Sequence, residues 1–224
     1  MQHSIAENIT RIKSQLPHGV SLVAVSKYHP VEQLQEAYAA GQRIFGESHA
    51  QELVAKAPAM PEDVKWHFIG HLQRNKVRHI LPFVSLIHSV DSIRLLTAIN
   101  KEAERIGRKI NVLLQLHVAQ EQTKSGFTIG EMLTLARTGA FQSYNNVCFC
   151  GLMAMGTFTS DEAVVAAEFA SVSHTFSLLR EENIFPKELF TEISMGMSDD
   201  WHIAVHHGAT MVRIGTDIFG PRQY

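Results

Sequence analysis

The stretch that decides the fold is SLVAVSKYHPVEQLQEAYAAGQRIF, residues 21–45. It begins with an apolar, β-branched run at residues 21–26, continues with an amphipathic helical pattern at 31–40, and reaches a second apolar run at 43–45. Gly41 stands where the helix has to end, because glycine readily adopts the left-handed backbone that closes many helices. The stretch therefore predicts a strand, a crossover helix and a second, parallel strand.

The same alternation of short apolar runs and amphipathic segments continues to the end of the chain. Strands are predicted at residues 21–26, 43–45, 65–69, 85–89, 110–116, 147–153, 188–193 and 211–214. Helices are predicted within residues 1–16 and at 31–40, 49–57, 73–81, 92–106, 129–137, 161–180 and 199–207. Eight strands that alternate with helices, with no linker between them, predict one α/β domain over residues 1–224, a (β/α)8 barrel of the TIM type. A doubly wound open sheet is the main alternative.

Two sets of residues mark the ends of the predicted helices. The N-terminal set can accept hydrogen bonds from the first N–H groups of a helix and comprises Asp91 or Ser92, Thr128, Ser160 and Ser198. The C-terminal set can adopt the left-handed backbone and comprises Gly41, Gly107, Gly139 and Gly208.

The amino-acid composition argues against a nucleic-acid-binding protein and against a membrane protein. The chain has 224 residues, 45% of them hydrophobic and 19% charged, and its net charge at pH 7 is −2. Nucleic-acid binding needs clustered Lys and Arg, whereas positive charge occurs here in short, scattered pieces, so no nucleic-acid partner is expected. No stretch approaches the roughly 18 apolar residues of a membrane span, and residues 1–16 lack the apolar core of a secretory signal, so no membrane partner is expected. Cys148 and Cys150 are too close in sequence for a good disulfide, and we interpret them as buried thiols of a cytoplasmic protein.

Lys27 is the first residue with a candidate chemical role. It follows the apolar run at residues 21–26, so it lies at the C-terminal end of a predicted barrel strand, the face where barrel enzymes build their active sites. Partial burial at such a position favours the neutral amine of a lysine, which Schiff-base chemistry requires. By position alone, a lysine that begins a surface loop is the simpler interpretation.

Two C-terminal segments have the character of a phosphate site. SMGMSDD at residues 194–200 opens a predicted helix, and VRIGT at residues 212–216 leaves the last predicted strand. Small and hydroxyl residues at a helix N-terminus expose backbone N–H groups to an anion, and the loops after strands seven and eight of this barrel commonly bind phosphate. Lys27 lies on the adjacent first strand. Each glycine alone would also fit a simple tight turn.

Short motifs in order along the chain carry a family resemblance. They are VAVSK (23–27), FGE (45–47), HFIGHLQRNK (67–76), IHSVD (87–91), KSG (124–126), GLM (151–153), SMGMSD (194–199) and VRIGTDIFG (212–220). In these motifs, which cover nearly the whole chain, the sequence resembles the homeostasis proteins that bind pyridoxal 5′-phosphate (PLP), the YggS/PROSC family. That family is related to the N-terminal barrel of bacterial alanine racemase, a PLP protein of fold type III. The resemblance implies this barrel and a non-catalytic protein that carries and buffers PLP for client enzymes.

The resemblance also assigns residues to the cofactor. The expected cofactor-binding residues are Lys27, Ser194, Ser198, Arg213, Gly215 and Thr216. Lys27 is expected to hold PLP as a Schiff base and Arg213 to face the pyridine nitrogen, while the other four hold the phosphate, with Ser194 in an assisting role. A guanidinium stays charged, so it disfavours a proton on the ring nitrogen and makes PLP a weaker electron sink for carbanion chemistry.

A free-standing amino-acid racemase is the principal alternative function. Racemisation needs an acid/base group on each face of the substrate carbon. In alanine racemase the second group comes from a C-terminal domain supplied across a dimer, and a chain that ends at Tyr224 is expected to lack it. The sequence therefore predicts a carrier without enzymatic activity, and a monomer. A barrel that binds a sugar phosphate without PLP is a further alternative.

Several single positions have their own interpretations. Ser48 stands where the family has Asn, and its shorter side chain reaches less far toward a cofactor. Lys124 is a second lysine in a loop after a predicted strand, and we interpret it as solvated. His67 is expected to face the barrel core or the cofactor ring. His202 and His206 have the i, i+4 spacing of a helical zinc pair, but no third ligand is evident, so no metal is expected.

Overall fold

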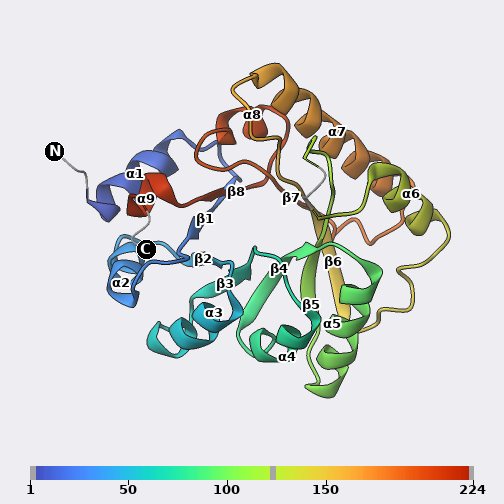
Figure 1. The fold of residues 1–224 in the computed structure, drawn as a ribbon, viewed down its shortest axis with the longest axis horizontal. Coiled ribbons are helices and arrows are strands. Elements are labelled where there is room, and N and C mark those ends of the chain that lie inside the picture. Colours follow the sequence, from blue (N-terminus) through green and yellow to red (C-terminus); the bar gives the residue numbers. More distant parts are fainter. Residues whose placement is uncertain (1–3, 122–124, 222–224) are drawn as a thin grey trace.

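The computed structural model describes residues 4–121 and 125–221, and the strands of these residues close into one parallel barrel in the order β1 to β8 (Figure 1). The strands are β1 (Ser21–Val25), β2 (Ile44–Glu47), β3 (Lys65–Phe68), β4 (Val84–Val90), β5 (Ile110–Gln115), β6 (Val147–Met153), β7 (Glu192–Ser194) and β8 (Met211–Ile214). The barrel closes because β1 pairs with β8, in register from Ser21 opposite Met211 to Ala24 opposite Ile214. The predicted barrel is therefore confirmed, and the open-sheet alternative is wrong.

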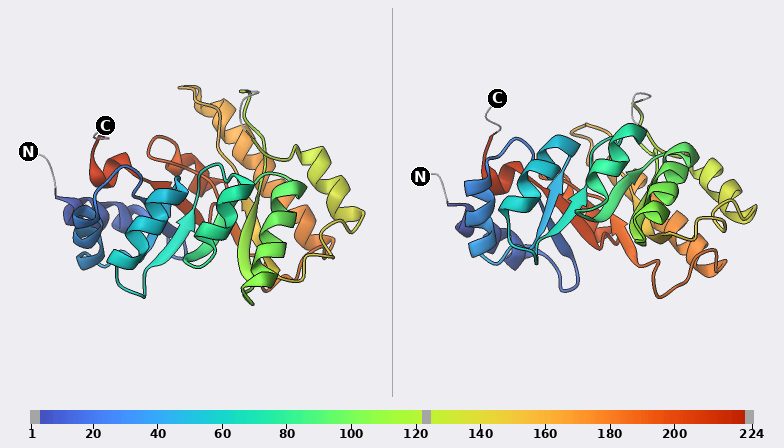
Figure 2. Two further views of the ribbon diagram at one scale, coloured as in Figure 1. Left: turned by 60° about the horizontal axis from the view of Figure 1, so that its bottom comes forward. Right: turned by 90° about the horizontal axis from the view of Figure 1, so that it is seen from below.

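Helices surround this barrel. They are α1 (Ile5–Gln15), α2 (Val31–Ala39), α3 (Ala50–Lys56), α4 (Val77–Ile80), α5 (Ile93–Arg105), α6 (Ile129–Arg137), α7 (Glu162–Glu181), α8 (Trp201–His206) and α9 (Thr216–Phe219), with 3-10 turns η1 (Ala57–Ala59) and η2 (Arg74–Lys76). Helices α1 and α9 lie side by side although they come from opposite ends of the chain (Figures 1 and 2), and the Asn8 side chain donates to the Ile218 carbonyl at 3.2 Å. Among the described residues, no helix combines the length and apolar character that a membrane crossing requires.

The helix ends largely follow the predicted signals. Gly41, Gly107, Gly139 and Gly208 all have positive φ angles, between 64° and 86°. The Ser92 and Thr128 side chains accept hydrogen bonds from the first turns of α5 and α6, as predicted. The other two caps were wrong. Asp161 caps α7 in place of Ser160, and Asp200 is the residue before α8 in place of Ser198.

Three predicted elements differ in the structure. The seventh strand is shorter and later than residues 188–193, because the N–H groups of Leu189 and Phe190 both donate to the Pro186 carbonyl and form a turn instead. The helix predicted at residues 73–81 divides into η2 and α4. Helix α9 has no counterpart among the predicted elements.

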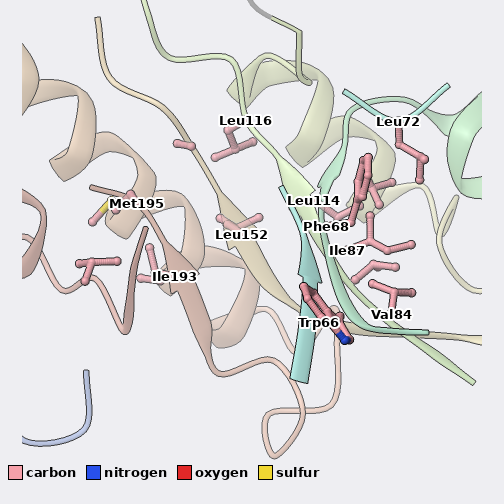
Figure 3. Packing of buried hydrophobic residues seen from close by; sticks show 14 of the residues in the cluster. Trp66, Phe68, Leu72, Val84, Ile87, Leu114, Leu116, Leu152, Ile193 and Met195 are labelled. Carbon is pink, nitrogen blue, oxygen red and sulfur yellow. The ribbon is translucent and has the colours of Figure 1, made fainter. Parts of the chain in front are cut away.

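The side chains of the strands alternate between the barrel interior and the helices. The outward side chains form the larger apolar core, part of which Figure 3 shows where Phe68, Ile87 and Leu114 of neighbouring strands meet. The interior holds a smaller apolar cluster made of Val23, Leu86, Leu113, Met153 and Met211. Two residues further along their strands, His88 follows Leu86 and Arg213 follows Met211 on the same inward face. A polar layer therefore lies above the apolar cluster, nearer the C-terminal ends of the strands.

The two cysteines lie on β6 as free thiols. Their sulfur atoms are 3.8 Å apart, as expected of two residues on one face of a strand. Both are half-buried rather than buried, which corrects the sequence interpretation. Burial, together with the neighbouring Cys148 thiol, raises the pKa of Cys150 to about 12, so this thiol keeps its proton at physiological pH.

Candidate functional site

A cavity of about 310 Å³ opens at the C-terminal ends of the barrel strands. It is lined by Val25, Lys27, His29, Ser48, Ile69, Met155, Phe158, Met197, Ser198, Asp199, Arg213, Gly215, Thr216 and Gly220. Its volume is at the lower end of the range of small-molecule sites. Larger hollows of about 600 Å³ lie over η2 and α5; exposed charged side chains line much of them, and Asp91, directly after β4, lines one of them. Five of the six predicted cofactor residues meet in the 310 Å³ cavity, and Ser194 is the exception.

Lys27 reaches this cavity because it follows the C-terminal end of β1. It is half-buried, and it has the same parity as Val23 and Val25, which face the barrel interior. The chain turns sharply at this point, with the His29 N–H donating to the Ser26 carbonyl at 3.1 Å. Tyr28 lies in the left-handed region, with φ at 67°, which is rare for a residue other than glycine. The lysine is thus presented from a tightly turned segment at the barrel mouth.

Arg213 forms the floor of the cavity and is buried in the barrel. Its guanidinium donates to the Ser194 carbonyl at 2.8 Å, to the Ser194 hydroxyl at 2.7 Å and to the Ala154 carbonyl at 3.0 Å. Burial lowers the pKa of Arg213 to about 10, so the guanidinium remains charged at neutral pH. These bonds use both Nη1–H donors and one of the two on Nη2, so that the Nε–H and one Nη2–H remain of the five donors.

Two neutral histidines continue this polar layer across the barrel. His88 Nδ1 lies 2.9 Å from the Ser194 hydroxyl, and His88 Nε2 lies 2.9 Å from His67 Nδ1. Burial lowers the pKa of His67 to about 3 and that of His88 well below its ordinary value, so both rings are uncharged at neutral pH. The Ser194 hydroxyl accepts from Arg213 and also contacts His88, and the tautomer of each ring decides which nitrogen donates along this chain. His67 therefore faces the barrel core, one of its two predicted surroundings.

Small and hydroxyl residues form another part of the cavity lining. Ser198 lies in the loop between β7 and α8, and Gly215 is the residue before α9. The first intrahelical bonds of α9 are those of the Ile218 and Phe219 N–H groups to the Gly215 carbonyl, so the Thr216 N–H precedes them. A side chain at position 215 would put its Cβ 3.2 Å from Val25, so glycine permits the close approach of this loop to β1. The donors in this part are uncharged.

Apolar side chains complete the cavity, and none of them was predicted. They are Val25, Ile69, Met155, Phe158 and Met197. Phe158 is 90% exposed, although its N–H donates to Glu121 Oε1 at 2.9 Å. No local sequence pattern distinguishes Phe158, because it lies in the loop after β6 and shares the cavity with residues of β1 and β8 only once the barrel has closed.

The remaining candidate residues have separate positions. Ser48 lines the cavity, whereas Lys124 lies outside the described residues. His202 and His206 are exposed, and His206 Nδ1 lies 2.8 Å from the His202 carbonyl rather than facing a metal position. Across residues 4–121 and 125–221, no group of three or more His, Cys, Asp or Glu side chains is arranged to hold a metal ion.

The sequence was compared with protein families and with curated proteins, and the matches show to which family this chain belongs. The sequence-family model described as "Alanine racemase, N-terminal domain" matches residues 2–223. The pyridoxal phosphate homeostasis protein of Pasteurella multocida is 35% identical over 99% of both chains. The protein of the same name from Schizosaccharomyces pombe is 37% identical over 98% of this chain and 92% of its own. This chain belongs to the pyridoxal phosphate homeostasis protein family.

Solved structures agree with this assignment. PipY of Synechococcus elongatus, a family member, is 37% identical over 97% of this chain and 100% of its own, with a TM-score of 0.90 without PLP and 0.86 with PLP bound. Alanine racemase of E. faecalis is only 20% identical, with a TM-score of 0.72 over 97% of this chain and 57% of its own, and it shares the fold. The resemblance inferred from the sequence motifs is confirmed.

Proposed function

We propose that this chain binds PLP in the 310 Å³ cavity as a Schiff base on Lys27 and carries the cofactor for PLP-dependent client enzymes. The observation that carries the proposal is that Lys27 and the donors Ser198, Gly215 and Thr216 line one cavity, although they come from opposite ends of the chain. An amine and an anion cradle in one small cavity match the aldehyde and the phosphate of PLP. Membership of the pyridoxal phosphate homeostasis family supports the same function.

The other cavity residues also fit this cofactor. In this proposal one of the two remaining donors of Arg213 faces the pyridine nitrogen, and the Ser194 hydroxyl holds the guanidinium from behind. Ser194 then acts on the cofactor through Arg213, which modifies the assisting role predicted for it at the phosphate. Ile69, Met155 and Met197 offer apolar contacts to the ring. When bound, PLP would supply an electrophilic aldehyde and a ring that can accept electron density.

We further propose that the chain is a carrier and not an enzyme. A charged guanidinium at the ring nitrogen opposes protonation of the ring, and an unprotonated ring stabilises a carbanion poorly. Arg213 keeps its charge at neutral pH despite its burial, which supports this reading. We also propose that the protein is monomeric and cytoplasmic and that it contacts its client enzymes transiently.

Borohydride trapping tests the proposed function. Purified protein is incubated with PLP, reduced with borohydride, digested and analysed by mass spectrometry. We expect one pyridoxyl group, located on Lys27, and an absorbance band of the imine that Lys27→Ala removes. Lys187→Ala is the control, because Lys187 is an exposed lysine in the turn before β7. A wild-type protein that stays colourless and gains no mass would contradict the proposal and favour the sugar-phosphate alternative.

A further inference from the structure

A cluster of three charged residues, of which Glu47 and Lys56 are buried and Glu52 is half-buried, lies on the outer side of the Lys27 segment. Lys56, the last residue of α3, directs its ammonium at Glu47 Oε1 (2.8 Å), at Glu52 Oε2 (2.7 Å) and at the Ser26 carbonyl (2.9 Å). The Lys56 side chain is 9% exposed and that of Glu47 is 0% exposed. None of the three residues lines the cavity, so any effect on a ligand must pass through other residues.

The cluster holds the residues on both sides of Lys27. On the preceding residue, the Ser26 hydroxyl donates to Glu47 Oε1 at 2.6 Å and the Ser26 carbonyl accepts from Lys56. On the following residue, the Tyr28 N–H donates to Glu52 Oε2 at 2.8 Å. The backbone of Lys27 is therefore held on both sides, at Ser26 and at Tyr28, and the Lys56 ammonium links the two sets of hydrogen bonds.

The second anchor lies where the backbone is strained. Tyr28 has a φ of 67°, and a side chain at this angle costs free energy that glycine would not incur. The hydrogen bond to Glu52 offsets that cost, because it forms only when the Tyr28 N–H points toward α3. Release of Tyr28 would let the turn relax and change the direction in which Lys27 leaves β1.

The opposite charges of Lys56 and of the two carboxylates, Glu47 and Glu52, hold the cluster together. Each of the three ammonium protons of Lys56 has an acceptor. Burial raises the pKa of Glu47 against the opposing effects of Lys56 and Ser26. Burial also acts to raise the pKa of Glu52, but hydrogen bonds from Lys56 and the Tyr28 N–H hold it below its ordinary value. Removal of Lys56 would leave two close carboxylates without a counter-ion, the costly case for buried charge.

We propose that Lys56, held between Glu47 and Glu52, is a positioning residue that fixes the Ser26–Tyr28 turn so that the Lys27 amine points into the cavity. The inference rests on the proposed function, in which Lys27 forms the Schiff base. It also gives the two lysines different roles, since the Lys56 ammonium donates to three acceptors and does not act as a nucleophile.

The rate of imine formation tests this role. Stopped-flow absorbance follows imine formation after apo-protein is mixed with PLP. Lys56→Met is expected to slow this step about tenfold or more, and Lys56→Arg, which restores a cation between the carboxylates, is expected to recover most of the rate. The control is Asp63→Asn, which removes the partner of Arg43 in an exposed ion pair beside β2, and it should react like the wild type.

A second pair of variants tests the strained turn without removing the cation. Glu52→Ala removes the acceptor of the Tyr28 N–H and is expected to slow imine formation. Tyr28→Gly should restore the rate in the Glu52→Ala background, because glycine adopts the left-handed angle at little cost. Urea unfolding of Glu52→Ala and of the double variant distinguishes a restored turn from a general gain in stability. If Lys56→Met unfolds, this pair decides the question.

The outcomes separate this inference from the proposed function. A wild-type protein that forms no imine contradicts the proposed function itself. Wild-type rates in folded Lys56→Met, or an absence of rescue by Tyr28→Gly, would overturn the positioning role while Lys27 remained the site of the Schiff base.

Discussion

The Arg213 guanidinium on β8 donates to both the carbonyl and the hydroxyl of Ser194 on β7, at 2.8 and 2.7 Å. The two bonds fix the plane of the guanidinium from one neighbouring residue. The same hydroxyl contacts His88, so the orientation of Arg213 depends on a chain of neutral groups that crosses the barrel. In the proposed function this chain determines how the positive charge meets the pyridine ring.

Ser194→Ala is expected to weaken PLP binding several-fold and to lower the free energy of unfolding by about 1–3 kcal/mol. The substitution leaves a buried, charged N–H of Arg213 without its hydroxyl acceptor, and an unsatisfied buried donor costs free energy of this order. Equilibrium dialysis and urea unfolding measure the two effects. Ser14→Ala removes an exposed hydroxyl on α1 and serves as the control. Unchanged affinity and stability in Ser194→Ala would show that the hydroxyl does not support Arg213.

We expect that the imine at one end of PLP and the hydrogen bonds to the phosphate at the other end can be removed independently. Lys27→Ala should abolish the imine absorbance yet retain some PLP, whereas Ser198→Ala should keep the imine but release PLP faster. The reason is that each hydrogen bond to the phosphate contributes roughly 1.5–3 kcal/mol independently of the imine. Dialysis followed by cofactor quantitation checks both variants. Equal retention of pyridoxal and PLP by the wild type would be evidence against the phosphate cradle.

The holo-protein is expected to leave single L-amino acids unchanged. The charge of Arg213 disfavours the protonated ring that carbanion chemistry needs. Chiral chromatography after prolonged incubation with L-alanine measures racemisation. Turnover that Lys27→Ala abolishes would support the racemase alternative instead of the carrier.

Gly151→Ala is expected to destabilise the barrel by about 3 kcal/mol or more. Gly151 has a φ of 152°, and a Cβ built on it would lie 1.8 Å from the Glu192 carbonyl oxygen on β7. Thermal and urea unfolding measure the change. Gly130→Ala in the first turn of α6 is the matched control, because a Cβ there meets nothing within 4 Å. Similar stabilities of the two variants would argue against the close packing of β6 on β7.

The buried histidines predict a loss of stability in mild acid. Their pKa values are depressed in the folded state, to about 3 for His67, whereas an unfolded histidine binds a proton near pH 6.5. Between these values the unfolded chain holds more protons, so the unfolding free energy falls as the pH falls, by about 1.4 kcal/mol per pH unit for each such histidine. Urea unfolding between pH 6.5 and 4.5 should give a smaller slope for His67→Gln than for the wild type. His174→Gln, at an exposed position of α7, is the control, and an unchanged slope in His67→Gln would contradict the assignment.

Local sequence patterns determined much of the fold. Most strands and helices are encoded within their own residues by hydrophobic periodicity, and several helix ends are marked by glycines such as Gly41 and Gly208. The strand end at Lys27 was predictable for the same reason, because an apolar run stops immediately before it. The seventh strand was predicted too early because the Pro186 carbonyl accepts the N–H groups of Leu189 and Phe190, and this turn replaces the start of the predicted strand.

Which residues form the site depends on which strands are neighbours in the barrel and on whether each side chain points into the barrel or toward the helices. The motif SMGMSD indicated that Ser194 and Ser198 are important, but the structure separates them: Ser194 ends β7 and lies behind Arg213, whereas Ser198 lies in the following loop and lines the cavity. The cluster around Lys56 joins β1, β2 and α3, and no local pattern indicates that its ammonium meets the Ser26 carbonyl. A sequence by itself specifies periodicity, charge and turn residues, because these act over a few positions. The contacts of His88, Lys56 and Phe158 arise only when the barrel closes, because closure brings residues far apart in the sequence within hydrogen-bonding and packing distance.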